Sequence, residues 1–147
     1  MIHYWFSFKE SIAILRESVK RDTRPGVAFF FTGLSCSGKS TLAQLLLARL
    51  QELQDREVTF LDGDVIREHL SKGLGFSKED RDENVKRVGF VAREVVKHGG
   101  LVICSLIAPY RDARRYVRTM VENYGDSIEN VYATPHPHII SYHDTFL

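Results

Sequence analysis

The residues best suited to chemistry form a loop near the start of the chain that fits the pattern G-x-x-x-x-G-K-[ST]. The loop runs Gly33-Leu34-Ser35-Cys36-Ser37-Gly38-Lys39-Ser40 and is followed by Thr41. Its glycines let the backbone wrap around phosphate, so that successive N–H groups and a helix N-terminus point at the anion. We predict that residues 33–41 bind the phosphates of ATP, with Lys39 on the β and γ oxygens and Ser40 on Mg²⁺. The alternative is a plain strand-to-helix turn.

The two cysteines of the chain, Cys36 and Cys104, form no recognisable disulfide or zinc pattern. At Cys36 the side chain has to point away from the bound phosphates. It either fills space there as a small residue or makes the loop sensitive to oxidation.

Two carboxylates, Asp62 and Asp64, follow the next apolar segment. In an open α/β sheet, ligands bind at the carboxyl ends of the strands, so we expect both acids to face the γ-phosphate. One can hold Mg²⁺ or its waters, and the other can orient or deprotonate an attacking hydroxyl. The alternative for Asp64 is that it only caps the helix that follows.

The elements that must position these residues alternate along the chain between apolar strands and amphipathic helices. Strands are predicted at residues 27–31, 57–61, 101–106 and 130–133. Helices are predicted at residues 11–20 and 41–54, from the capping box of Ser77 and Asp80 to Gly99, and from Pro109 to about Asn123. Strands alternating with helices predict an α/β fold, with a parallel sheet between two layers of helices.

Size and composition indicate a single domain. The chain has 147 residues, 44% hydrophobic and 27% charged, with a net charge of +1. This charge gives no reason to expect nucleic acid or a membrane surface as a partner. No apolar run approaches the roughly 18 residues that span a bilayer, and the first residues lack a positive leader and a cleavage site. We therefore expect a cytoplasmic protein.

Three segments resemble signatures of the adenylylsulfate (APS) kinase family. Residues 60–67 are similar to its LDGDxxR segment, residues 74–84 to LGFSxxDRxEN, and residues 107–114 to ISPYRxxR. The resemblance runs from about Phe29 to Gly125, in the family's order and spacing. It implies a three-layer P-loop kinase fold and a transfer of the γ-phosphoryl group of ATP to the 3′-hydroxyl of APS, with Mg²⁺ as the cofactor.

The resemblance also implies roles for single residues. It makes Asp62 the base or the metal-side acid, with Asp64 assisting. The acceptor site that it implies consists of Arg67, Arg81 and Asn84 on the phosphosulfate and ribose, Phe76 near the adenine, and the backbone of Ile107, Ala108 and Pro109. Guanidinium groups also suit a doubly anionic acceptor on physical grounds, because their planar donors bind phosphate and sulfate oxygens in pairs. Arg81 alone could equally form a surface ion pair.

The chain departs from the family pattern in two places. Ala108 stands where the family commonly has a serine that carries phosphate in some members, so direct in-line transfer is expected. Residues 134–147 do not resemble the family's lid, helix and strand. We expect residues 1–26 to form an N-terminal helix or connector, residues 27–133 a kinase domain truncated at its C-terminal side, and residues 134–147 an irregular tail.

Two alternatives to an active APS kinase stay open. The chain could be a nucleotide-binding fragment with impaired catalysis, because a lid excludes water from the transfer. It could also be another small-molecule P-loop kinase. Residues 12–18 resemble the connector of fused sulfurylase–kinase proteins, which suggests an ancestry in such a fusion, and the family resemblance suggests a homodimer.

Overall fold

The computed structural model describes residues 24–53, 56–122 and 127–132. These ranges contain, in chain order, β1 (Val27–Thr32), α2 (Lys39–Leu53), β2 (Val58–Asp62), α3 (Gly63–His69), α4 (Lys78–Lys97), β3 (Leu101–Ser105), α5 (Arg111–Glu122) and β4 (Ser127–Tyr132).

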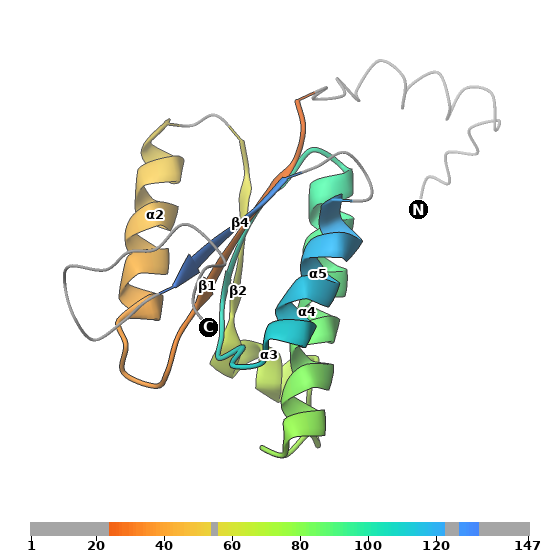
Figure 1. The fold of residues 1–147 in the computed structure, drawn as a ribbon. Helices are drawn as coiled ribbons and strands as arrows, with labels where there is room; N and C mark the ends of the chain where they lie inside the picture. Colours follow the sequence, from red (N-terminus) through yellow and green to blue (C-terminus); the bar gives the residue numbers. More distant parts are fainter. Residues whose placement is uncertain (1–23, 54–55, 123–126, 133–147) are drawn as a thin grey trace, which may run out of the picture.

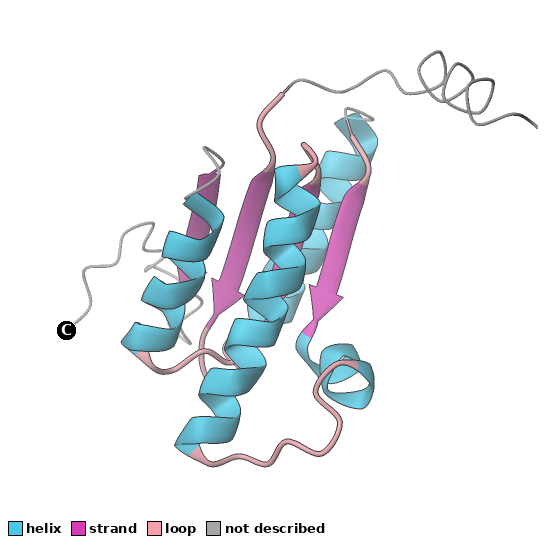
Figure 2. Ribbon diagram, turned by 90° about the vertical axis from the view of Figure 1, so that its right-hand side faces the viewer, coloured by secondary structure: helices cyan, strands magenta, loops and turns pink. Residues whose placement is uncertain are grey.

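The four strands form one parallel sheet in the order β2-β3-β1-β4. Helix α2 covers one face of this sheet, whereas α4 and α5 lie side by side over the other (Figure 1; Figure 2). Because side chains alternate along a strand, neighbouring residues of β1 enter different cores. Phe30 packs with the side chains of α4 and α5, and Phe31 packs with Ala43 of α2. The predicted α/β architecture with three layers is confirmed.

The predicted elements agree with the structure to within one or two residues, except at the last strand. The strand predicted at 130–133 begins three residues earlier, at Ser127. The predicted start of α4 is confirmed, since the Ser77 hydroxyl accepts a hydrogen bond from the Asp80 N–H at 3.1 Å. The helix predicted at 11–20 and the domain limits at 26 and 133 depend on residues outside the described ranges and stay predictions.

A glycine in the middle of α4 sets how closely this helix approaches α5. A Cβ atom on Gly89 would lie 2.4 Å from Cγ2 of Val117, which is too close for any side chain. The gain in packing offsets the cost of a glycine inside a helix, which is about 1 kcal/mol relative to alanine. As a result, α4 and α5 form one continuous cover over the sheet.

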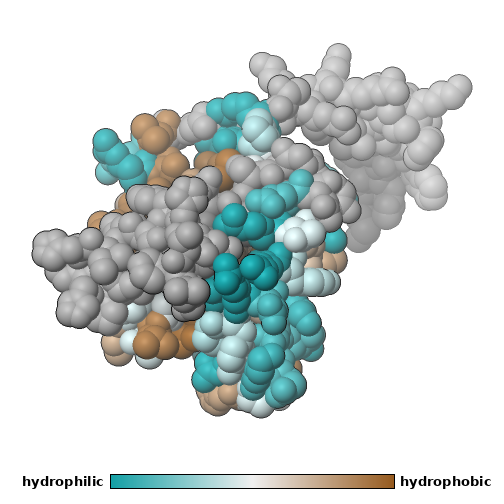
Figure 3. Space-filling view, in the orientation of Figure 1, coloured by the Kyte–Doolittle hydropathy of each residue, from teal (hydrophilic) through white to brown (hydrophobic). Residues whose placement is uncertain are grey.

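The two faces of the molecule differ at the surface. The side of α4 and α5 is mostly hydrophilic in Figure 3 but exposes Phe90 and Tyr116, whereas α2 exposes Leu45 and Leu53. Among the described residues, no helix combines the length and the apolar composition that crossing a membrane requires.

Candidate active site

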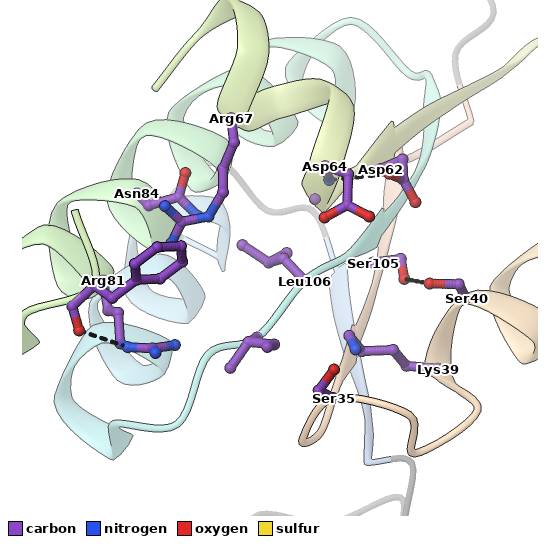
Figure 4. Close-up of a pocket in the computed structure, with 13 residues that line it drawn as sticks. Ser35, Lys39, Ser40, Asp62, Asp64, Arg67, Arg81, Asn84, Ser105 and Leu106 are labelled. Carbon is purple, nitrogen blue, oxygen red and sulfur yellow. Dashed lines mark hydrogen bonds between the residues drawn. The ribbon is translucent and has the colours of Figure 1, made fainter. Parts of the chain in front are cut away.

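A cavity of about 260 Å³ lies at the carboxyl ends of the strands (Figure 4). The residues that line it are Ser35, Lys39, Ser40, Asp62, Gly63, Asp64, Arg67, Phe76, Arg81, Asn84, Ser105, Leu106 and Ile107. They come from the segments that follow three neighbouring strands and from the first turns of α4. Residues far apart in the sequence meet here because all strands of a parallel sheet end at the same edge.

The predicted phosphate loop connects β1 to α2. Gly38 has a φ of +85°, a left-handed conformation that only glycine adopts without strain. The Leu34 carbonyl accepts hydrogen bonds from the Ser37 N–H at 3.2 Å and from Lys39 Nζ at 3.3 Å. Of the predicted loop, Ser35, Lys39 and Ser40 line the cavity. Gly33, Leu34, Cys36, Ser37, Gly38 and Thr41 complete the loop and the start of α2 without lining it.

The two cysteines have opposite environments. Cys36 is exposed and has a φ of +60°, which is unusual for a residue with a side chain. Cys104 is buried in β3, and burial raises the pKa of its thiol far above the ordinary value. Of the two, only Cys36 is accessible to solvent, so it does not fill space in the core.

The two predicted carboxylates both line the cavity, but they are held differently. Asp62 is the N-cap of α3, where its Oδ1 accepts hydrogen bonds from the N–H groups of Asp64 at 3.0 Å and Val65 at 3.5 Å. The idea that Asp64 caps this helix is therefore wrong. Asp64 is exposed, and Figure 4 shows its side chain next to Asp62 at the cavity.

Gly63 explains how the two acids fit at the end of β2. A Cβ atom on Gly63 would lie 2.9 Å from the Ser105 carbonyl oxygen and 3.2 Å from the Leu106 Cβ. Only glycine allows α3 to begin this close to the next strand, and so the acids are brought to the cavity edge.

Ser105 belongs to the site although its sequence context did not single it out. It ends β3, is buried, and places its Oγ 3.2 Å from the Ser40 Oγ. The signal that could have found it is positional, since Ser105 pairs in register with Asp62 of β2. A polar residue at the end of a buried parallel strand is a candidate ligand-binding residue for the same reason that Asp62 is.

The opposite side of the cavity carries two guanidinium groups on one aromatic ring. Arg67 and Arg81 lie 4.6 Å and 5.5 Å from the centre of the Phe76 ring. Arg67 also donates to the Gly75 carbonyl at 3.2 Å, and Arg81 to the Phe76 carbonyl at 2.9 Å. Within the described residues Arg81 thus bonds to a carbonyl and not to a carboxylate, so the alternative of a surface ion pair is not realised there.

Asn84 and the segment after β3 close the cavity. Asn84 is 3% exposed, and its Oδ1 has no hydrogen-bond partner among the described residues. Ile107 lines the cavity, but Ala108 and Pro109 do not. The reason is that the Ala108 N–H and carbonyl are turned inward, to Thr32 Oγ1 at 3.0 Å and Arg114 at 2.8 Å.

The side chains at the loop side of the cavity suit Mg²⁺. Ser40, Asp62 and Asp64 offer hard oxygen donors and no nitrogen or sulfur. In the described part of the chain, no three His, Cys, Asp or Glu residues are grouped as a metal site. This set fits a magnesium ion bound through one or two carboxylates together with substrate phosphates, and not an all-protein cage.

Comparison with known proteins finds a matching family model and similar sequences. The sequence model of the family described as Adenylylsulphate kinase matches residues 25–145. The chain is 58% identical over 95 residues to an adenylyl-sulfate kinase of Chloroflexus aurantiacus, which covers 65% of this chain and 50% of that protein. It is 43% identical over 122 residues to a sulfate adenylyltransferase of Chaetomium globosum, covering 83% of this chain and 21% of that protein.

Solved structures give the same result. The fold is similar to a hexameric APS kinase from Thiobacillus denitrificans, with a TM-score of 0.72 and 48% identity over 97% of this chain and 29% of that chain. It is also similar to the Mycobacterium tuberculosis APS kinase CysC in complex with AMPPNP and APS, with a TM-score of 0.70 and 36% identity over 75% of this chain and 63% of that chain. The chain thus spans about half the length of the adenylyl-sulfate kinase that it matches and less of the larger proteins.

Proposed function

The chain belongs to the adenylylsulphate kinase family, and we propose that it transfers the γ-phosphoryl group of ATP to the 3′-hydroxyl of adenosine 5′-phosphosulfate. One observation carries this proposal. A single cavity joins Lys39 and Ser40 of the phosphate loop to Arg67 and Arg81. A donor bound on the loop and an anionic acceptor bound on the arginines would meet inside it.

The loop side would bind ATP. The backbone N–H groups of residues 33–41 and the N-terminus of α2 would bind the phosphates, as in a phosphate cradle. Lys39 would leave the Leu34 carbonyl and reach the β and γ oxygens. Transfer of a phosphoryl group asks little covalent chemistry of the protein, so the contribution of this side is positioning and neutralisation of charge.

Ser40 and Asp62 would hold Mg²⁺, in part through water. The ion would supply charge neutralisation on the phosphate oxygens. Asp62 suits this role because two backbone N–H groups hold its Oδ1, which fixes the carboxylate at the end of β2. The Asp62 side chain would then be both the N-cap of α3 and a ligand of the metal ion.

Asp64 would orient or deprotonate the attacking 3′-hydroxyl, with Asp62 beside it. It is exposed and lines the cavity between the loop and the arginines. A carboxylate in reach of the hydroxyl accepts its proton as the bond to phosphorus forms. Ala108 offers no hydroxyl that could carry phosphate, so the group moves in one step from ATP to the acceptor.

The arginine side would bind the acceptor. Arg67 and Arg81 present planar donors suited to phosphate and sulfate oxygens, and Phe76 offers an exposed ring to an adenine. Asn84 supplies a buried carbonyl oxygen that lacks a partner among the described residues and suits a ribose hydroxyl. Ile107, with the backbone towards Ala108 and Pro109, would border this subsite. The Mycobacterium tuberculosis enzyme, solved with AMPPNP and APS, supports the same pair of substrates.

The setting of the reaction is part of the proposal. We place the chain in the cytoplasm, with ATP and APS as its partners and without nucleic acid or membrane. The similarity to a sulfate adenylyltransferase supports an ancestry in a sulfurylase–kinase fusion. Pairing with a second copy of the chain is a further expectation of the family resemblance.

The test is direct detection of 3′-phospho-APS from the purified chain, MgATP and APS. Lys39→Ala is expected to abolish product, whereas Lys86→Ala, which removes an exposed lysine of α4 outside the cavity, is expected to leave it unchanged. A folded chain that binds APS without forming product would overturn the proposed transfer and indicate a nucleotide-binding fragment. Product from another hydroxyl compound, and not from APS, would indicate a different small-molecule kinase.

A further inference from the structure

The metal-binding side of the cavity is built from the phosphate loop and the ends of two further strands. P-loop nucleotide-hydrolysing enzymes hold Mg²⁺ with the loop Ser or Thr and an aspartate. Here the strand next to β1 is β3, which ends in Ser105, and the acid Asp62 ends β2, one strand further away. Neighbouring strands lie about 4.8 Å apart, so the backbones of β1 and β2 are separated by about 10 Å.

Ser105 occupies the gap between the loop and the acid. Its Cα is in register with Asp62 on one side and with Phe31 of β1 on the other. Its Oγ lies 3.2 Å from the Ser40 Oγ, and Ser105 is only 2% exposed. In Figure 4 this pair of hydroxyls lies between Asp62 and Lys39.

A serine hydroxyl that ligates a cation must turn a lone pair to the ion and its proton elsewhere. An acceptor close to the Ser40 oxygen can receive this proton and so hold the hydroxyl in that orientation. Among the described residues, Ser105 Oγ lies within hydrogen-bond distance of the Ser40 oxygen. Either hydroxyl of this pair can be the donor. Ser105 Oγ can accept because a hydroxyl oxygen has two lone pairs, and it would do so once a lone pair of Ser40 faces the ion.

We propose that Ser105 is a positioning residue for the metal ligand Ser40: it accepts the Ser40 proton and thereby aims the Ser40 lone pair at Mg²⁺. This inference rests on the proposed function, in which Ser40 and Asp62 hold the ion. Ser105 acts through Ser40 and does not touch the nucleotide.

The experiment measures ADP binding by titration calorimetry, with and without Mg²⁺, for the wild-type chain and Ser105→Ala. In the wild-type chain Mg²⁺ is expected to strengthen ADP binding. In Ser105→Ala this gain is expected to shrink about fivefold, the usual effect of one lost hydrogen bond, whereas ADP alone binds as before. Ser105→Thr, which keeps the hydroxyl, is expected to restore the gain. The EPR spectrum of Mn²⁺ bound with ADP is expected to change in Ser105→Ala and to return in Ser105→Thr.

Thr32→Val is the matched control, because it removes a buried hydroxyl from the end of the adjacent strand that bonds to Ala108 and not to Ser40. In Thr32→Val, Mg²⁺ should strengthen ADP binding by the same factor as in the wild-type chain. Equal weakening of ADP binding with and without Mg²⁺ in Ser105→Ala would show a merely structural bond and overturn the inference. An unchanged gain in Ser105→Ala would overturn it too, and would leave the proposed function standing. A wild-type chain whose ADP binding ignores Mg²⁺ would overturn both this inference and the metal site.

Discussion

The two sides of the cavity hold their polar groups by different means. On the loop side, Ser40 is bonded to a buried serine and Asp62 is bonded to the backbone of α3. On the arginine side, Arg67 and Arg81 rest on the Phe76 ring, which is 71% exposed, and on carbonyls of the short loop before α4. The first set depends on the sheet, and the second on a surface segment. Substitutions on the loop side should therefore impair every step that needs ATP. Substitutions on the arginine side should impair only the binding of the acceptor APS.

The largest effect is expected from Lys39→Ala. Loss of a cation at the site where charge develops lowers kcat by about 1,000-fold, as for other preorganised donors. The fold should persist, because among the described residues the Lys39 side chain donates its hydrogen bond to the Leu34 carbonyl of its own loop. The measurement is kcat for 3′-phospho-APS formation together with the thermal unfolding midpoint. Activity within tenfold of the wild-type chain would contradict the role of the loop.

Substitutions of Asp62 can separate the two functions of its side chain, which are to cap α3 and to bind the metal ion. Asparagine caps helices about as well as aspartate, so Asp62→Asn should keep the stability of the wild-type chain and lose about 100-fold in activity through the missing charge near the metal. Asp62→Ala should lose the activity and, in addition, about 1 kcal/mol of unfolding free energy. Denaturant unfolding and steady-state kinetics check both. Equal stability of the alanine and asparagine variants would refute the capping role.

Arg81→Lys tests the acceptor side with its charge retained. The planar fork is lost, and one charge-assisted hydrogen bond fewer raises the KM for APS about tenfold. The KM for ATP should not change, because Arg81 lies across the cavity from the loop (Figure 4). Steady-state kinetics with each substrate varied in turn distinguishes the two. A rise of both KM values by the same factor would contradict the assignment of ATP and APS to separate sides of the cavity.

Phe76→Leu should have a smaller effect of the same kind. The ring stacks with both guanidinium groups, and exposed contacts of this type contribute about 0.5–1 kcal/mol each. We expect the KM for APS to rise about threefold to fivefold. Unfolding free energy should change by less than about 0.5 kcal/mol, because the ring is exposed. Loss of several kcal/mol in stability would mean that Phe76 has a structural role instead.

Cys36→Asn should be the mildest change. Asparagine tolerates the left-handed conformation better than cysteine does, so the variant should gain up to about 0.5 kcal/mol in unfolding free energy. Activity should stay the same, because Cys36 does not line the cavity. Loss of inhibition by a thiol-oxidising reagent in this variant would identify Cys36 as the residue that makes the loop sensitive to oxidation. Unchanged inhibition would exclude it, since Cys104 is buried.

Much of the fold and of the site could be predicted from local sequence. The apolar runs at β1 and β3, the glycine-rich loop and the capping residues of α4 each act over a few residues, and their predictions agree with the structure. The motif segments predicted that Lys39, Arg67, Arg81 and Asn84 belong together, and they line one cavity. These features are readable because strand burial, helix capping and the phosphate loop have local sequence signatures.

The remaining features depend on neighbours that the sequence does not specify. Whether Asp62 or Asp64 caps α3 depends on where this helix can begin. It can begin directly after Asp62 because Gly63 has no side chain that would clash with the Ser105 carbonyl. Ala108 borders the cavity without lining it, because its N–H donates to the hydroxyl of Thr32, 76 residues earlier in the chain. The stacking of Arg81 on Phe76 likewise replaced an ion pair that composition alone could not exclude.

By itself the sequence determined the α/β order, the phosphate loop and the set of charged residues at the strand ends, because each is encoded within one segment. Only the tertiary structure decided that Ser105 stands between Ser40 and Asp62, since this follows from the order β2-β3-β1 in the sheet and not from any spacing along the chain. Strand order brings together residues separated by 65 positions, and hydrogen bonds between their side chains form only once that order exists.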